Sequence, residues 1–228
     1  MTTPIGRSGR EAAAFSGVYY PGSETLVNKL GIREERQLSV AERQFTDRRM
    51  SQGLPANAQA LTYEGFKAIH HHLFQDLYDW AGQERAYTTG RGPAPFAPPE
   101  QITPWMEKQM ESLSAQNFLR GLEPARFCAQ AAELVNEINA AHPFIEGNGR
   151  VQRIWLRQVA QQAGYKLEFA EQDKSLWYEA SRIGFEQADN KPMARLLQTN
   201  LSRLPDLQRQ VPASKRSRGR DDNRGPER

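Results

Sequence analysis

The strongest constraint on the fold is a pair of apolar-periodic segments, 123–140 and 149–163, joined by a short connection that contains two glycines. Both segments carry apolar side chains every three or four residues, which predicts two helices that each bury one face. Pro124 favours the start of the first helix and Gly164 ends the second. The predicted buried residues are Phe127, Ala131, Leu134, Ile138, Val151, Ile154, Trp155, Val159 and Ala163. The chain is therefore organised around a helical hairpin.

The connection and the start of the second helix, residues 142–153, read HPFIEGNGRVQR. Gly147 and Gly149 lack a Cβ, so the backbone N–H groups around them can turn toward an anion. A helix that begins here directs the positive end of its dipole to the same place. Arg150 and Arg153, three residues apart, present two guanidinium groups on one side of that helix. These residues predict a site for a nucleotide triphosphate.

Four further side chains complete the predicted site. His142 ends the first helix, where we expect it to face a cleft, and a neutral imidazole is a natural general base near pH 7. Glu146 would be repelled by phosphate unless a divalent cation such as Mg²⁺ lay between them. Asn148 is suited both to the turn and to donating to phosphate. Phe144 is expected to be an apolar anchor of the loop.

Other nucleotide and metal patterns are absent from the sequence. It contains no GxxxxGK[ST] loop, no GxGxxG after a strand and no kinase signature set. His70, His71 and His72 are consecutive on a helix predicted over 62–80. Consecutive helical residues point roughly 100° apart, so these three cannot bind one metal ion together. We expect them to be packed or exposed side chains without a metal.

The rest of the chain also reads as mainly helical. Ser23 is a candidate N-cap for a helix that includes Leu26 and Leu30. Ser39 and Glu42 have the spacing of a capping box, which predicts a helix over 39–50. Further helices are predicted over residues 101–118, 175–186 and 192–201, with a short element at 166–170.

Between Ala86 and Pro99 the sequence predicts a short hairpin. Its strands are expected at 87–89 and 93–96, with a turn at Gly90-Arg91-Gly92. From the residues alone, a single exposed hairpin on a helical protein is a lid, a binding edge or a connector. The predicted fold class is therefore all-α, a helical bundle with one short β-hairpin.

Length and charge define the expected boundaries. We expect residues 1–17 to be a flexible segment, 18–204 to form one domain and 205–228 to be a basic, disordered tail. From residue 215 onward basic residues exceed acidic ones by three, which equals the net charge of +3 for all 228 residues. The domain is therefore not expected to bind nucleic acid directly.

Cysteine content and hydropathy predict where the protein is found. No apolar run approaches the roughly 18 residues of a membrane span, and the N-terminus lacks a secretion signal. The single cysteine, Cys128, excludes an internal disulfide and is expected to be a buried structural thiol. We expect a cytoplasmic protein without a membrane partner.

Residues 142–153 resemble the signature of Fic-domain proteins, H-x-F-x-[D/E]-G-N-G-R-x-x-R, and match it at every specified position. Residues 79–82 and 96–99 resemble the segments that flank the β-hairpin flap of that family, so the likeness extends over about residues 20–200. The resemblance implies the Fic fold, a helical bundle in which the hairpin is a flap that docks the target. The flap residues implied here are Thr88, Thr89, Gly90 and Arg91.

Most family members with this motif transfer AMP from ATP to a protein hydroxyl. The resemblance implies that His142 deprotonates the target hydroxyl, that Glu146 holds Mg²⁺ and that the flap clamps the target by strand addition. The implied phosphate contacts are Gly147, Asn148, Gly149, Arg150 and Arg153. Candidates for the adenine pocket are Trp177 and Ser181.

Many relatives carry an inhibitory [S/T]-x-x-x-E-[G/N] helix whose glutamate pairs with the second motif arginine. The E-[G/N] end occurs here at Glu64 and Glu146, but Ala60 and His142 stand four residues earlier instead of Ser or Thr. The chain therefore resembles the subgroup of bacterial toxins that a small separate antitoxin restrains, and residues 20–30 are similar to the N-terminal segment of that subgroup.

The resemblance also implies targets and alternatives. The short toxins that the chain resembles modify the ATPase subunits of DNA gyrase (gyrase B) and topoisomerase IV. A second interpretation is a secreted Fic effector that modifies host proteins, with the basic tail as part of its secretion signal. A third is a catalytically idle Fic-fold interaction module.

Overall fold

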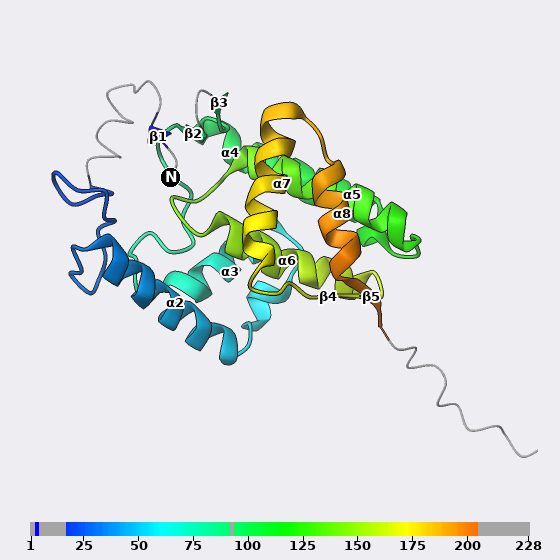
Figure 1. Ribbon diagram of the computed structural model, residues 1–228, viewed down its shortest axis with the longest axis horizontal. Helices are drawn as coiled ribbons and strands as arrows, with labels where there is room; N and C mark the ends of the chain where they lie inside the picture. The colour runs from blue at the N-terminus through cyan, green and yellow to red at the C-terminus, as the bar shows by residue number, and fades with distance from the viewer. Residues whose placement is uncertain (1–2, 5–16, 92–93, 205–228) are drawn as a thin grey trace, which may run out of the picture.

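The computed structural model describes residues 3–4, 17–91 and 94–204 (Figure 1). Within this part of the chain the helices are α2 (Glu35–Ser51), α3 (Tyr63–Phe74), α4 (Pro99–Ala115), α5 (Pro124–Ala141), α6 (Asn148–Gln162), α7 (Asp173–Gln187) and α8 (Lys191–Asn200). Two short 3₁₀ helices occur at Ala56–Gln59 and Asn117–Leu119. The predicted helical bundle is confirmed. The tail 205–228 and most of residues 1–17 lie outside the described residues.

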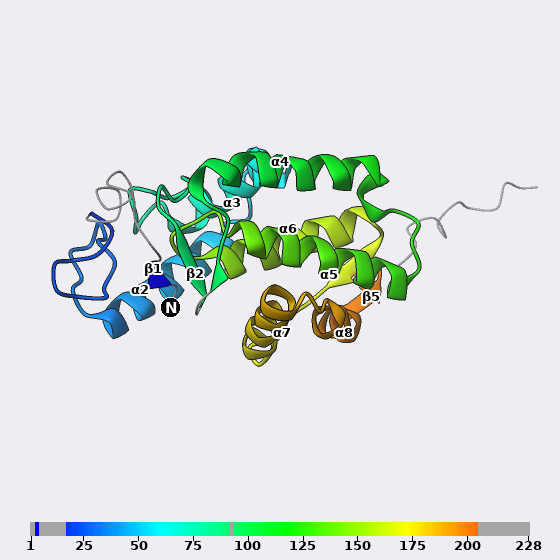
Figure 2. The same cartoon turned by 90° about the horizontal axis from the view of Figure 1, so that it is seen from above.

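The predicted pair of helices, α5 and α6, forms the centre of the bundle. Seen from above, α4 runs along one side of this pair, and α7 and α8 lie on the other side (Figure 2). The predicted inward faces are confirmed except at Ala163, which follows α6 and is only partly buried. Burial of such apolar side chains is the main favourable term in folding. Fully buried residues on the two helices include Phe127, Ala131, Val135, Ile138, Val151, Trp155 and Val159. None of the helices in the described ranges is long and apolar enough to cross a bilayer.

Two small antiparallel sheets accompany the helices. One has the order β1-β2-β3 and the other pairs β4 with β5. The strands are β1 (Thr3–Pro4), β2 (Thr89–Arg91), β3 (Ala94–Pro95), β4 (Tyr165–Leu167) and β5 (Leu201–Arg203). β4 and β5 pair the segment after α6 with the segment after α8 (Figure 1).

The β2–β3 hairpin, which we call the flap, differs from its prediction in two respects. Its first strand begins at Thr89 and includes Gly90 and Arg91, so these two residues are not the turn. The connecting residues 92–93 lie outside the described residues. In addition, β2 is not an edge strand, because Thr3 pairs with Gly90 on the side opposite β3. In the described residues, β2 is therefore the central strand of a three-stranded sheet, and β3 is an edge strand.

Three helix predictions are wrong: one predicted helix is absent, one begins earlier than predicted and one ends earlier. Residues 23–32 form turns, since the Ser23 hydroxyl accepts the N–H of Thr25 at 2.9 Å instead of capping a helix. The next helix, α2, begins at Glu35 without a side-chain cap, so the capping box predicted from residue 39 does not form. Thr62 does cap α3, accepting the N–H of Gly65 at 3.1 Å, but that helix ends at Phe74.

Candidate active site

The loop between α5 and α6 is held by the amide of Asn148. Its Oδ1 accepts the N–H of Phe144 at 3.0 Å, and its Nδ2 donates to the carbonyl of the same residue at 2.8 Å. Asn148 is buried. Its role in the turn is therefore confirmed, whereas a side-chain contact with phosphate stays a prediction.

Phe144 anchors this loop in the core, as predicted. Its ring is fully buried and stacks on His70 with centroids 3.9 Å apart. Nδ1 of His70 accepts the N–H of Gly82 at 2.8 Å, so Nε2 carries the proton and donates to the carbonyl of Glu146 at 3.0 Å. Burial lowers the pKa of His70 to about 3, which keeps this arrangement at neutral pH. His70 is thus a structural support of the loop, because both of its ring nitrogens are hydrogen-bonded to backbone groups.

Only one of the two motif glycines is required by the protein itself. Gly147 is the N-cap of α6 with φ 84°, and a Cβ there would lie 2.4 Å from the ring of Phe74. Gly149 is helical, and a Cβ would meet only ordinary contacts, the nearest being Arg153 at 3.5 Å. The fold itself therefore requires a glycine at 147 and not at 149, and the contact of both glycines with phosphate stays a prediction.

His142, the expected base, is buried and does not face an open cleft. It is the C-cap of α5 in the left-handed region, with φ 45°. Only 9% of its surface is exposed, because the ring of Phe96 stacks on the imidazole at 4.0 Å and 2°. Phe96 directly follows strand β3 and is distant from His142 in the sequence, yet its ring covers the imidazole. The predicted exposure of His142 is wrong for this reason.

The surroundings of His142 keep the imidazole neutral. Burial is the main cause and lowers its pKa to about 3, with the positive charges of Arg85 and Arg91 acting in the same direction. An interaction with the backbone of Asn139 acts in the opposite direction. At pH 7 the imidazole is therefore unprotonated, as a general base must be.

Glu146 stands at the mouth of the site with about half of its side chain exposed. Its Oε1 accepts the N–H of Gly147 at 2.8 Å and lies 3.4 Å from Nη2 of Arg150. The described residues contain no group of three or more His, Cys, Asp or Glu side chains that would hold a metal ion alone. A single exposed carboxylate fits Mg²⁺, which takes one or two carboxylates and completes its shell with phosphate and water.

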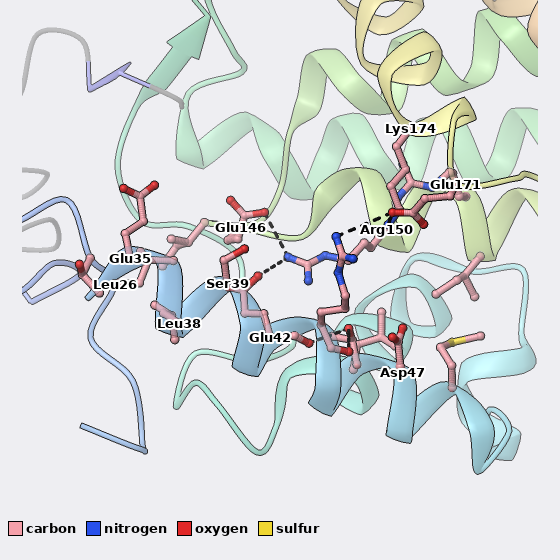
Figure 3. Close-up of a pocket in the computed structure, with 18 of the residues that line it drawn as sticks. Leu26, Glu35, Leu38, Ser39, Glu42, Asp47, Glu146, Arg150, Glu171 and Lys174 are labelled. Atoms are coloured by element: carbon pink, nitrogen blue, oxygen red, sulfur yellow. Dashed lines mark hydrogen bonds and ion pairs between the residues drawn. The ribbon is translucent and has the colours of Figure 1, made fainter. Parts of the chain in front are cut away.

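Arg150 has a partner that the motif does not contain. Its Nη2 lies 2.6 Å from Oε2 of Glu42 on α2, and the hydroxyl of Tyr78 donates to the other oxygen of that carboxylate. Arg150 therefore lies between the carboxylates of Glu42 and Glu146 (Figure 3). Burial lowers the pKa of Arg150, but these two carboxylates reverse the shift and raise it. Sequence reasoning missed this role of Glu42.

Arg153 is placed for an incoming anion. It forms no ion pair within the described part of the chain, and its guanidinium lies over the ring of Trp177, 5.7 Å from the centroid. Burial, then the neighbouring charges of Arg150 and Arg157, lower its pKa to about 10, so it remains charged at neutral pH. A partly buried cation without a carboxylate partner favours binding of a phosphate or carboxylate from outside.

Three of the predicted residues open into one cavity of about 960 Å³. Glu146, Arg150 and Arg153 line it together with α2 and residues 169–174 (Figure 3). Its volume is in the range of small-molecule sites. His142 is not on its wall, and the ring of Phe96 covers the imidazole.

The candidates for the adenine pocket are not part of the lining of this cavity. Trp177 is buried, and its Nε1 is 4.0 Å from where a Cβ of Gly149 would lie. Ser181 is buried too, and its Oγ has no hydrogen-bond partner in the described structure. Both lie on α7. Their contact with adenine remains a prediction.

The flap residues are turned toward α7. Thr89 and Gly90 are buried, and Thr88 and Arg91 are partly exposed. The guanidinium of Arg91 lies 4.7 Å from the ring centroid of Tyr178 on α7. The first strand is therefore less exposed than expected, whereas Ala94 is partly exposed and Pro95 is exposed on the second strand. Arg91 and Phe96 bring the hairpin close to the base, as a docking segment requires.

Comparison with known proteins finds relatives that match most of the chain. The sequence matches the Fic/DOC family over residues 60–160. A probable protein adenylyltransferase of Sinorhizobium fredii is 35% identical over 176 residues, covering 77% of this chain and 90% of that protein.

Solved structures share the fold. The BepC effector protein of Bartonella tribocorum, with bound AMPPNP, has a TM-score of 0.75 at 25% identity and covers 87% of this chain and 100% of its own. An N-terminal Fic domain of an effector from Bartonella quintana, with bound ADP, has a TM-score of 0.72 at 29% identity, over 83% of this chain and 96% of its own. The chain therefore belongs to the Fic/DOC family and is one of its protein adenylyltransferases.

Proposed function

We propose that this chain transfers AMP from ATP to a hydroxyl side chain of a target protein. The hydroxyl oxygen attacks the α-phosphorus, the bond from that phosphorus to the β-phosphate oxygen breaks, and pyrophosphate leaves. His142 takes the hydroxyl proton. The observation that carries the proposal is a neutral, buried His142 at one end of a loop whose other end presents Glu146, Arg150 and Arg153 to a cavity.

The remaining site residues bind and orient the nucleotide. The N–H groups of residues 147–149 lie at the start of α6, where the helix dipole favours negative charge. Arg153 is free to bind the terminal phosphates, and Arg150 is held close by through Glu42. Glu146 would hold Mg²⁺, which would neutralise charge on the phosphates. Nucleotides bound in the Bartonella structures support ATP as the donor.

The position of the label in ATP tests this function directly. We expect label at the α-phosphate to appear on a protein band of a bacterial lysate and label at the γ-phosphate to appear on none. Chelation of divalent cations with EDTA is expected to abolish the transfer, and added Mg²⁺ to restore it. Transfer of γ-label would indicate a kinase, and no transfer of either label would indicate a catalytically idle module.

We further propose that the protein is a bacterial toxin, acting in the cytoplasm and controlled by a small antitoxin. Its own sequence lacks the inhibitory motif, and Arg153 forms no ion pair within the described ranges, so its guanidinium is not already paired when a glutamate from another protein reaches it. The charge of Glu171 also acts on Arg153. ATP and that glutamate would compete for the same guanidinium. Type II topoisomerase ATPase subunits, namely gyrase B and its topoisomerase IV counterpart, are the targets that we propose.

Co-expression tests this control. With the short reading frame adjacent to the gene expressed at the same time, growth is expected to recover and α-label on the target to disappear. The matched control is a partner in which the glutamate of its inhibitory motif is replaced by glutamine, which should restore labelling. Unchanged toxicity and labelling with the intact partner would contradict an antitoxin.

One observation favours a second biological role with the same chemistry. The two Bartonella relatives are VirB-translocated effector proteins. A secreted effector would label proteins of a eukaryotic lysate, whereas the proposed toxin would label bacterial topoisomerase subunits. The same α-labelled ATP applied to both lysates distinguishes them.

A further inference from the structure

Arg85 is among the largest fully buried side chains, with 1% of its surface exposed. Its Nε donates to the carbonyl of His142 at 2.7 Å, and Nη1 donates to the carbonyl of Tyr87 at 2.8 Å. Nη2 donates to two more carbonyls, of Ala97 and, at 3.0 Å, of Ala141. A single guanidinium thus binds four backbone carbonyl oxygens.

These four carbonyls belong to two separate parts of the site. Ala141 and His142 end α5, where the last carbonyls of a helix lack intrahelical partners and a cation is favourable. Tyr87 precedes the flap and Ala97 follows it. Arg85 therefore joins both sides of the flap to the residue that carries the base.

Neighbouring contacts fix the same unit. The N–H of Arg85 donates to the carbonyl of Pro143 at 2.8 Å, and the N–H of Ala97 donates to that of Ala140 at 3.0 Å. The ring of Phe96 stacks on the imidazole of His142. Hydrogen bonds donated by Arg85 and Ala97 to carbonyls of residues 140–143 thus connect both sides of the flap to the backbone around His142.

We propose that Arg85 is a positioning residue that fixes the flap relative to His142, so that a target segment on the flap presents its hydroxyl to the imidazole. This inference rests on the proposed AMP transfer. Burial of a guanidinium has a large desolvation cost, which the four carbonyls offset. A lysine cannot span the same four oxygens, because it lacks the planar fork of donors. Misplacement of reacting groups by about 1 Å lowers rates by about 100-fold, which gives this contact its importance.

The charge of Arg85 acts on the same residue. It faces His142 together with that of Arg91, and both oppose protonation of the imidazole. Arg85 therefore has two separable effects, one from its fork of donors and one from its charge. Replacement by lysine keeps the charge and removes the fork, and replacement by methionine removes both.

The test compares Arg85→Lys and Arg85→Met with the unaltered full chain. In Arg85→Lys we expect α-label transfer to lysate protein to fall by about 10- to 100-fold, with a much smaller loss in AMP release to water, which needs no flap. Arg85→Met is expected to shift the acid limb of the rate–pH profile to higher pH, because the pKa of His142 rises when a positive charge is removed. Arg85→Lys should leave that limb in place.

Leu197→Ala, at a fully buried position of α8, is the control for general destabilisation. It should lower both reactions in proportion to the folded fraction, measured by thermal unfolding. If Arg85→Lys lowers transfer to protein and to water equally, Arg85 has only a structural role and the proposal is wrong.

Hydrogen exchange in the unaltered protein tests the coupling without any substitution. The amides of Arg85 and Ala97, which bond to Pro143 and Ala140, should open with the same free energy. Clearly different protection of the two amides would contradict a rigid unit, even if both variants fail to fold. Absence of α-label transfer in the unaltered protein would instead refute the proposed function, and the exchange result would still decide the coupling.

Discussion

Replacement of His142 by alanine is expected to lower the rate of AMP transfer by about 10²- to 10⁴-fold, the usual contribution of a general base. ATP should still bind, because the substitution removes none of the phosphate contacts at Arg150 and Arg153. Initial rates with α-labelled ATP measure the loss, and calorimetric titration with ATP measures binding. Since the pKa of His142 is about 3, the base is neutral above that value. The rate of the unaltered protein should therefore stay flat as the pH falls from 8 through 6.

The left-handed backbone at His142 calls for a second variant. Alanine is strained at φ 45°, whereas asparagine adopts this region readily. His142→Asn keeps a polar side chain in the same backbone conformation but cannot accept the proton as imidazole does. Equal loss in both variants would show that the base is what matters. Substantial transfer by His142→Asn would mean that another group deprotonates the target.

Gly147→Ala is expected to destabilise the fold by roughly 2–5 kcal/mol, from left-handed strain and overpacking together. Its φ is 84°, and the new methyl group would lie 2.4 Å from the ring of Phe74, a fully buried side chain. The ring cannot move aside easily, because it packs against His70 and Tyr78. For a domain of this size, thermal unfolding should occur roughly 5–15 °C lower. Differential scanning calorimetry measures the shift.

Gly149→Ala is the matched control, two residues further on. A Cβ at this helical position meets no atom closer than 3.5 Å, and alanine is favoured over glycine in helices. Its stability should be equal or slightly higher, although ATP binding is expected to suffer from the added methyl group. The double variant Gly147→Ala with Phe74→Leu should recover part of the lost stability. Similar unfolding temperatures for Gly147→Ala and Gly149→Ala would contradict the steric argument.

The sequence predicts the chemistry of the α5–α6 loop because that chemistry is local. Asn148 holds Phe144 four residues away, and Arg150 and Arg153 share a side of α6 by helical geometry alone. The helical faces of α5 and α6 follow from apolar spacing in the same way. Contacts of this kind span one or two turns, so residue types and spacing are enough to predict them.

What surrounds the base could not be predicted, because it comes from distant segments. Phe96 covers His142, although the position of that histidine at a helix end predicts exposure. Glu42 has the spacing of a capping box with Ser39, but α2 begins before Ser39, and the carboxylate of Glu42 instead binds an arginine 108 positions later. His142 adopts a left-handed conformation, and the sequence has no glycine at this position that would indicate it. These three features depend on tertiary packing, which no local sequence pattern predicts.

The contact between Glu42 and Arg150 has a consequence for protein engineering. Residues 142–153 look like a portable cassette, since they contain the base, the metal carboxylate and both arginines. Grafted onto another helical hairpin, they would arrive without the carboxylate on α2. Arg150 would then have Glu146 as its only acidic neighbour from the cassette, and this pairing would compete with Mg²⁺ for that side chain. A transplanted loop therefore needs a second acidic residue supplied by the host scaffold.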